Sequence, residues 1–309
     1  MRIAILGAGA IGGYFGGRLV EAGEDVTFLV RPERKARLLQ HGLRIESVYG
    51  DATLPVTART ADEVTEPFDV VLLTCKAYDL DAAIDAIRPA VGPGTAVLPL
   101  LNGLDHIDRL NREFGAERVL GGLAKIAVNV TPDGVVKHLN DWRYITFGEQ
   151  SGEISPRVLA LQAALERSGA VAAAVPDIFQ KMWEKLVHLA TIAGMTTLMR
   201  ASVGEIARTE YGTEVMSRFL DANAEIAARE GFPPSAAFLD EYRALLADKT
   251  APYTASMLRD LERNGPVEAD HIIGFMLRKA QAHGLDTTVH EISYVHLKAY
   301  EERRAAGRL

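Results

Sequence analysis

A glycine-rich segment close to the N-terminus restricts the fold more than any other feature of the sequence. Residues 2–6 (RIAIL) predict a short β-strand, and Gly7, Gly9 and Gly12 follow with G-x-G-x-x-G spacing at the start of a helical pattern. In such a unit the first glycine allows a tight turn, the second lets a pyrophosphate approach the backbone, and the third lets helix and strand pack closely. A glycine-rich turn without a ligand is the alternative. The residues expected to form the phosphate site are Gly7, Ala8, Gly9, Ala10, Ile11 and Gly12.

Short apolar runs alternate with helical patterns through the rest of the first hundred residues. The run FDVVLLTC is continuously apolar, which is typical of a strand covered on both faces. Strands are predicted at 25–30, 68–75 and 95–101, with helices from Arg31-Pro32, near 78–88 and from about 104. Residues 43–58 alternate around Gly50-Asp51 and predict a hairpin or two short strands. The alternation predicts a doubly wound α/β fold with a parallel sheet.

The segment after the second predicted strand indicates which dinucleotide is bound. A chain that binds NAD usually places an acidic side chain here to hold the ribose hydroxyls. This chain has Arg31, followed by Arg34 and Lys35, with Glu33 as the only nearby acid. A guanidinium can bond a 2′-phosphate with two donors, whereas cations are disfavoured at a helix N-terminus. We therefore predict NADPH/NADP as the cofactor and Arg31 as its contact; a solvated basic helix start is the alternative.

Two polar residues follow buried strands directly. Lys76 comes after VVLLTC, and Asn102 comes after TAVLPLL. In open α/β sheets, ligands bind beyond the carboxyl ends of the strands. We therefore expect both side chains at the same sheet edge as the glycine loop. A snorkelling lysine and an ordinary turn asparagine are the alternatives.

The pattern changes after about residue 152. A helix at 155–167 and a short AVAAAV strand lead into helices that are separated by glycines and prolines. A chain of 309 residues is also long enough for two domains. We predict an NADP-binding Rossmann-type domain over residues 1–172 and an all-helical substrate and catalytic domain over residues 173–309.

Composition excludes several other classes of protein. A net charge of −7 argues against nucleic acid or an anionic membrane surface as the main partner. The single cysteine, Cys75, fits a reducing compartment, and no apolar run is long enough to cross a bilayer. With no leader pattern at the N-terminus, we expect a cytoplasmic protein. We expect no metal site, because His188, His271, His283 and His290 show no ligand spacing.

Residues 181–195 (KMWEKLVHLATIAGM) predict an amphipathic helix with a lysine at the head of an apolar stripe. No acid stands three or four positions from Lys185, so no salt bridge of helical spacing is available to it. The stripe that continues its face consists of Leu189, Ile192, Ala193 and Thr196. A cation beside apolar surface is costly, so this position calls for a functional reason.

Further motifs complete a recognisable set. Ser256 and Glu268 flank a turn at residues 264–266, although Glu268 could serve only as a helix cap. In order, the chain contains GAGAIG, an arginine after the second strand, TCKAYD, LLNG, WEKL, and SMLRD followed by GPVEADHIIGF. Together these motifs resemble the ketopantoate reductase (2-dehydropantoate 2-reductase) family over essentially the whole chain.

The resemblance implies a Rossmann domain, a helical domain and an active site in the cleft between them. It implies that NADPH reduces a 2-oxo acid to a 2-hydroxy acid, with Lys185 as the general acid that protonates the carbonyl oxygen. Desolvation, with Lys181 nearby, would lower the pKa of Lys185 toward working pH. The other implied roles are contact with nicotinamide and substrate by Asn102, orientation of substrate or cofactor by Lys76, binding of the substrate carboxylate by Ser256, and contact with the cofactor by Glu268.

The chain departs from the family at three substrate-binding positions. Where the family has asparagines, this chain has Leu189, Ala193 and Val203. A pocket that bonds a substrate hydroxyl discriminates strongly, whereas an apolar one does not. Candidates for replacement polar contacts are His188, Thr191, Thr196 and Thr197.

Three functions therefore remain open from the sequence. The first is a ketopantoate-type 2-oxo acid reductase, and the second is a reductase of the same fold for a more apolar ketone, 2-oxo acid or imine. The third is a non-catalytic NADP(H)-binding protein, against which the joint presence of Lys185, Asn102, Ser256 and Glu268 argues. The expected partner is a small-molecule 2-oxo acid or ketone, and a homodimer is also possible.

Overall fold

The computed structural model describes residues 1–309, which divide into two compact units. Unit 1 comprises Met1–Leu101 and His106–Ile178, and unit 2 comprises Asn102–Asp105 and Phe179–Leu309. The division after Ile178 lies beyond the predicted boundary at residue 172, because the strand that contains this residue pairs within unit 1. The short segment Asn102–Asp105 joins the helical unit, which the sequence analysis did not foresee.

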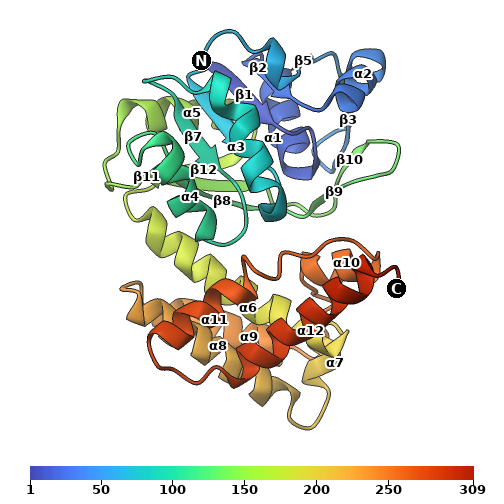
Figure 1. Cartoon of the computed structure of the whole chain (residues 1–309), viewed down its shortest axis with the longest axis vertical. Coiled ribbons are helices and arrows are strands. Elements are labelled where there is room, and N and C mark those ends of the chain that lie inside the picture. The colour runs from blue at the N-terminus through green and yellow to red at the C-terminus, as the bar shows by residue number, and fades with distance from the viewer. The chain divides into compact units, whose positions relative to one another are not determined.

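A five-stranded parallel sheet forms the centre of unit 1 (Figure 1). Its strands are β1 (Arg2–Leu6), β2 (Asp25–Leu29), β5 (Thr57–Arg59), β6 (Val70–Leu73) and β7 (Ala96–Pro99), in the order β5-β2-β1-β6-β7. Every residue of β6 and β7 is buried, as their continuous apolar runs predict. The chain winds outward from β1 in both directions, so the predicted doubly wound α/β class is confirmed.

Five helices and three short 3₁₀ turns lie between the strands of unit 1. They are α1 (Ala10–Glu21), α2 (Pro32–His41), α3 (Leu80–Ile87), α4 (Asp105–Phe114) and α5 (Pro156–Arg167), with short 3₁₀ turns η1 (Ala61–Glu63), η2 (Ala77–Asp79) and η3 (Arg88–Ala90). Helix α2 begins with Pro32 at its first position, where the fixed φ of proline suits a helix start. The predicted helix positions in this part of the chain are therefore confirmed.

Two smaller sheets complete unit 1. One has the order β4-β3-β10-β9, from β3 (Leu43–Glu46), β4 (Ala52–Leu54), β9 (Val128–Val130) and β10 (Val136–His138). The other has the order β12-β11-β8, from β8 (Leu120–Lys125), β11 (Tyr144–Glu149) and β12 (Val171–Ala174). The predicted hairpin around Gly50 is the antiparallel β3–β4 pair, and the φ of Gly50 is +103°.

Unit 2 is all-helical, as predicted. Its helices are α6 (Ile178–Met199), α7 (Val203–Ala207), α8 (Gly212–Arg229), α9 (Ala236–Ala247), α10 (Ser256–Glu262), α11 (Ile273–Ala282) and α12 (Thr288–Ala305). Helix α6 is buried from Ala190 to Thr197, so its second half forms part of the core of this unit. None of the helices combines the length and apolar character that crossing a membrane would require.

A buried polar network links three helices inside unit 2. The Asn223 Nδ2 of α8 donates to the Thr191 Oγ1 of α6 at 3.0 Å, and Asn223 Oδ1 accepts from His290 Nε2 of α12 at 3.0 Å. All three side chains are buried. Burial lowers the pKa of His290 from 6.5 to about 4, so this ring is neutral in the folded protein at neutral pH.

We expect His290 to make the stability of the protein depend on pH. The unfolded chain binds a proton at this histidine below pH 6.5, whereas the folded chain does so only near pH 4. The free energy of unfolding should therefore fall as the pH drops from 6.5 toward 4. Between pH 7 and pH 5 the loss should be about 2 kcal/mol, as measured by urea unfolding.

The variant His290→Gln tests this origin, because the amide can still donate to Asn223 but does not titrate. This variant should lose less stability than the wild type between pH 7 and pH 5. The matched control is His41→Gln, at an exposed position of α2. Equal pH slopes for the wild type and His290→Gln would contradict the prediction.

Candidate functional site

The glycine loop between β1 and α1 has the geometry that its spacing predicts. Gly7 has a φ of +92°, which the turn requires and which other residues rarely adopt. A Cβ at Gly12 would lie 2.3 Å from Gly7 O and 2.5 Å from Thr74 Oγ1, so the third glycine is fixed by packing. A Cβ at Gly9 would meet no atom within 4 Å, so space remains where the backbone is exposed.

The start of α1 suits an anion. Gly9 caps the helix without a side chain that satisfies the first N–H groups, and the first turn contains no acid. Free N–H groups and the positive end of the helix dipole favour a phosphate at such a position. Thr74, whose hydroxyl donates to Leu6 O at 2.7 Å, braces the loop from the end of β6. Sequence reasoning missed Thr74, although its place directly after a buried strand was a usable signal.

The three cations after β2 differ in their surroundings. Arg31 has a side chain 83% exposed, and its Nη2 lies 3.7 Å from Asp79 Oδ1. The Arg34 Nη2 instead donates to Ala8 O at 2.8 Å, so this residue tethers the glycine loop. Lys35 pairs with Glu63. Of the three side chains, that of Arg31 is the most accessible to a 2′-phosphate.

The predicted residues at the sheet edge divide between the two units. Lys76 lies in unit 1 directly before η2, three residues after the end of β6. Asn102 lies in unit 2, three residues after the end of β7. The hydrogen-bond partner of Asn102 is Lys185, on helix α6 of the same unit.

Lys185 and Asn102 meet in unit 2. The Lys185 Nζ donates to Asn102 Oδ1 at 3.1 Å, although the two residues are 83 positions apart in the sequence. Burial lowers the pKa of the Lys185 ammonium from 10.5 to about 8, and the negative charge of Glu268 opposes this shift. The expectation that Lys181 contributes to this pKa is wrong, because Lys181 pairs with Glu184 and burial is the cause.

The segment that carries Asn102 is held to the helices by its neighbours. Gly103 has a φ of +86°, and a Cβ there would lie 2.7 Å from His271 O. Asp105 Oδ2 lies 3.1 Å from Arg278 Nη2 and 3.8 Å from His271 Nδ1. These contacts fix the position from which the Asn102 side chain reaches Lys185.

Glu268 and Ser256 both lie in unit 2. Glu268 is 6% exposed, and helix α11 is capped by Ile272, so the capping alternative for Glu268 is wrong. A buried carboxylate whose charge acts on Lys185 is suited to keep that lysine protonated near neutral pH. Ser256 is the first residue of α10, and its side chain is partly exposed.

The positions where the family has asparagines lie in different surroundings. Leu189 is partly exposed, whereas Ala193 and Val203 are completely buried. Three of the suggested replacement residues are also buried, and each hydroxyl donates to the carbonyl four residues earlier; these are Thr191, Thr196 and Thr197. Their hydroxyls are therefore engaged by the helix backbone, which leaves His188 as the remaining candidate.

His188 belongs to an aromatic cluster that sequence reasoning did not predict. Its ring stacks on Tyr242 with centroids 3.9 Å apart and on Tyr253 with centroids 5.8 Å apart. His188 Nε2 also lies 3.3 Å from the Tyr253 hydroxyl. These contacts join residues from three separate segments, so no local pattern could have revealed them.

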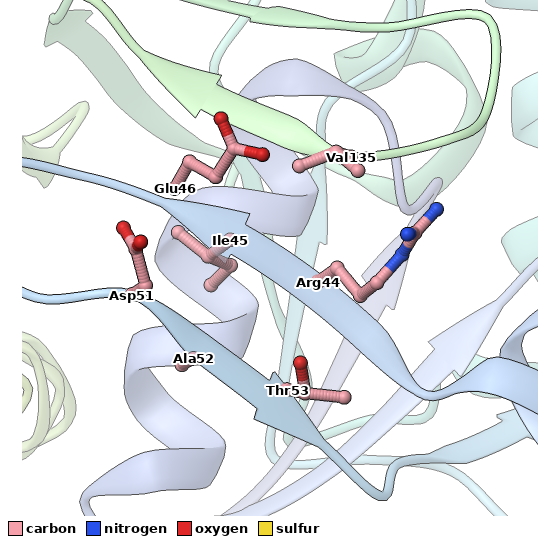
Figure 2. Close-up of a pocket in the computed structure, with 7 residues that line it drawn as sticks. All are labelled: Arg44, Ile45, Glu46, Asp51, Ala52, Thr53 and Val135. Carbon is pink, nitrogen blue, oxygen red and sulfur yellow. The ribbon is translucent and has the colours of Figure 1, made fainter.

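One hollow lies on the β3–β4 hairpin of unit 1, away from the glycine loop. Figure 2 shows Arg44, Glu46 and Asp51 among its lining residues. Arg44 pairs with Asp133 at 2.9 Å, and Glu46 pairs with Lys137 at 2.9 Å. Arg44 and Glu46 are thus used in local pairs, and none of the predicted site residues lines the hollow.

Comparison with known proteins agrees with these features. The model of the ketopantoate reductase PanE/ApbA family matches residues 3–152, and its C-terminal model matches residues 177–301. The chain is 34% identical to the uncharacterized oxidoreductase YkpB of Bacillus subtilis, over 98% of this chain and 100% of that protein. It is 32% identical to the 2-dehydropantoate 2-reductase of Archaeoglobus fulgidus, over 93% of this chain and 94% of that protein.

A solved structure gives the same result. The crystal structure of 2-dehydropantoate 2-reductase from Geobacter metallireducens matches with a TM-score of 0.88 and 30% identity. The match covers 97% of this chain and 99% of that chain. The chain therefore belongs to the ketopantoate reductase PanE/ApbA family of oxidoreductases.

Proposed function

We propose that this protein is an NADPH-dependent reductase that converts a 2-oxo acid into a 2-hydroxy acid. The observation that carries the proposal is the Lys185–Asn102 hydrogen bond of 3.1 Å, formed by a lysine whose pKa is lowered to about 8. A general acid works best with a pKa near the operating pH, because it is then both protonated and able to give up its proton.

The glycine loop and the cations around it fit the phosphates of a dinucleotide. The backbone of residues 7–12 would hold the pyrophosphate at the start of α1, and Arg31 would hold the 2′-phosphate. When bound, NADPH supplies the hydride that is added to the carbonyl carbon of the substrate. The fit rests on the open space at Gly9 and on the uncapped N–H groups of α1.

The helical unit supplies the proton. The Lys185 ammonium gives a proton to the carbonyl oxygen as negative charge develops there. Asn102 Oδ1 accepts a hydrogen bond from Nζ and so orients the ammonium, while Glu268 opposes the loss of its proton. Ser256 would hold the substrate carboxylate, and Lys76 would orient the substrate or the cofactor.

A reductase for a more apolar substrate is the second candidate. The observation that favours it is the open position of Leu189 one turn after Lys185, together with the burial of Ala193. Neither side chain can bond a substrate hydroxyl. A non-catalytic NADP(H)-binding protein is less well supported, because it gives no reason for a desolvated lysine that is hydrogen-bonded to Asn102 and feels the charge of Glu268.

Replacing Lys185 should remove catalysis while leaving cofactor binding in place. Lys185→Ala is expected to lower kcat by about 10²–10⁴-fold, the usual contribution of a general acid. Its Kd for NADPH should stay within about twofold of the wild type, because we assign the lysine to the substrate carbonyl. In the wild type, kcat should fall as the pH rises through about 8, because the lysine loses its proton there.

The control for this variant is Lys181→Ala, one turn earlier on the same helix. Lys181 pairs with Glu184 and is not assigned to the site, so this variant should keep its activity. NADPH oxidation would be followed at saturating 2-oxo acid. A Lys185→Ala variant with near wild-type kcat would show that the lysine is structural.

We expect tighter binding of NADPH than of NADH, with Arg31 as the cause. Arg31→Ala should weaken NADPH binding by about 10- to 100-fold, because a charge-assisted bond to the phosphate contributes on the order of 1.5–3 kcal/mol. NADH binding should change little. Fluorescence titration of both cofactors gives the two Kd values, with Arg112→Ala on the exposed side of α4 as the control. Tighter binding of NADH by the wild type would refute the assignment.

Ketopantoate should be a poor substrate. The asparagines that would bond its hydroxyl and carboxylate are replaced by Leu189 and Ala193. Each lost hydrogen bond costs about 0.5–1.5 kcal/mol, more with a charged partner, so kcat/KM should be ~10²-fold below that for a 2-oxo acid with a bulkier hydrocarbon tail. Leu189→Asn should raise kcat/KM for ketopantoate. If ketopantoate proves the best substrate of a panel, the prediction is wrong.

A further inference from the structure

The aromatic cluster of His188, Tyr242 and Tyr253 lies beside Lys185 on helix α6. Lys185, His188 and Leu189 are partly exposed, whereas Leu186 and Val187 between them are buried. Residues three and four apart share one face of a helix. Lys185, His188 and Leu189 therefore lie on one partly exposed face of α6. A molecule bound at Lys185 would contact His188 and Leu189.

The stack has a fixed order of rings. The planes of His188 and Tyr242 differ by 27°, and those of His188 and Tyr253 differ by 17°. Tyr242 also contacts Phe238 at 4.5 Å between centroids, which supports the far side of the stack. Tyr253 stands at the other end, and His188 is its only aromatic neighbour.

Tyr253 is held in place by its backbone. Its carbonyl accepts a hydrogen bond from Val203 N at 2.9 Å, and Gly204 N bonds Ala251 O at 2.9 Å. A Cβ at Gly204 would lie 2.8 Å from Ala251 O, so the close approach of the two segments requires glycine. The segment that ends in Ser256 is thereby fixed, and Tyr253 lies three residues before that serine.

We propose that Tyr253 and His188 determine the specificity of this site and select 2-oxo acids whose tail carries a planar aromatic ring. This inference rests on the proposed 2-oxo acid reductase activity. With the carboxylate at Ser256 and the oxo group at Lys185, the tail of the substrate meets the near-parallel rings. Flat rings stack on one another with an energy beyond simple burial, whereas a saturated ring of similar size does not.

The hydrogen bond between His188 and Tyr253 makes this pair of rings a rigid surface. It connects α6 to the segment before α10, and Tyr242 supports the histidine ring from behind. Rigid aromatic surfaces lose little conformational entropy when a ligand binds. A compact branched tail with a hydroxyl group, such as that of ketopantoate, cannot stack on these two rings.

The test compares phenylpyruvate with 3-cyclohexylpyruvate, whose rings are similar in size but only one of which is planar. In both acids a methylene separates the ring from the oxo group, so neither carbonyl is conjugated with a ring; KM is expressed per keto form, because phenylpyruvate also forms a conjugated enol. We expect the wild type to favour phenylpyruvate in kcat/KM by about two- to tenfold, mostly through KM. Tyr253→Leu should abolish this ratio, and Tyr253→Phe, which keeps the ring, should retain it.

The control variant is Tyr211→Leu, at a position 62% exposed before α8, and it should leave the ratio unchanged. A wild type that reduces both acids equally well would overturn the specificity proposal and leave the reductase function standing. A Tyr253→Leu variant that keeps the preference for phenylpyruvate would also overturn the specificity proposal. A wild type that reduces no 2-oxo acid with NADPH would overturn the proposed function itself. A wild type without the preference overturns the proposal even where Tyr253→Leu does not fold, and a Tyr253→Phe variant that keeps the preference supports the role of the ring.

Discussion

The Lys185 residue is partly exposed as a whole, but its ammonium is desolvated, and this constraint governs the polar contacts around it in unit 2. A buried charge is costly unless it is hydrogen-bonded or paired. Helix α6 offers no acid at salt-bridge spacing, so the compensation comes from Asn102 and Glu268, which are distant in sequence. The segment Asn102–Asp105, which supplies the first of these groups, belongs to the helical unit although it follows the last strand of the parallel sheet. Asn102 thus provides Lys185 with a hydrogen-bond acceptor that helix α6 does not provide at helical spacing.

The second half of α6 shows how a helix carries polar residues through a core. Thr191 and Thr196 donate to the carbonyls four residues earlier, so their hydroxyls need no partner from outside the helix. Asn223 and His290 extend this pattern across two more helices. Polar groups that satisfy one another rigidify a core but are not available to a substrate. On α6 the partly exposed face from Lys185 to Leu189 remains available for recognition.

The sequence predicted those features that depend on local pattern. Glycine spacing after β1 and the buried runs of β6 and β7 follow from backbone geometry and apolar periodicity, and the structure agrees. The inward direction of Arg34, the membership of Asn102 in unit 2 and the stacking of His188 on Tyr253 depend on contacts between distant segments. Such contacts leave no periodic signal, so the sequence could name candidate residues without showing which of them meet.

The proposed phosphate site in unit 1 and the proposed substrate site in unit 2 differ in what fixes their chemistry. The phosphate site depends on backbone: a positive φ at Gly7, close packing at Gly12 and open space at Gly9. Among side chains, Thr74 and Arg34 hold this loop through bonds to its backbone. In our proposal, recognition of the substrate tail depends instead on a few side chains on one helix face and one loop, of which Leu189 and Tyr253 are examples. On this proposal, exchange of these residues would alter the tail that fits without disturbing the lysine or the glycine loop. Membership of the family therefore determines the class of reaction more firmly than the substrate.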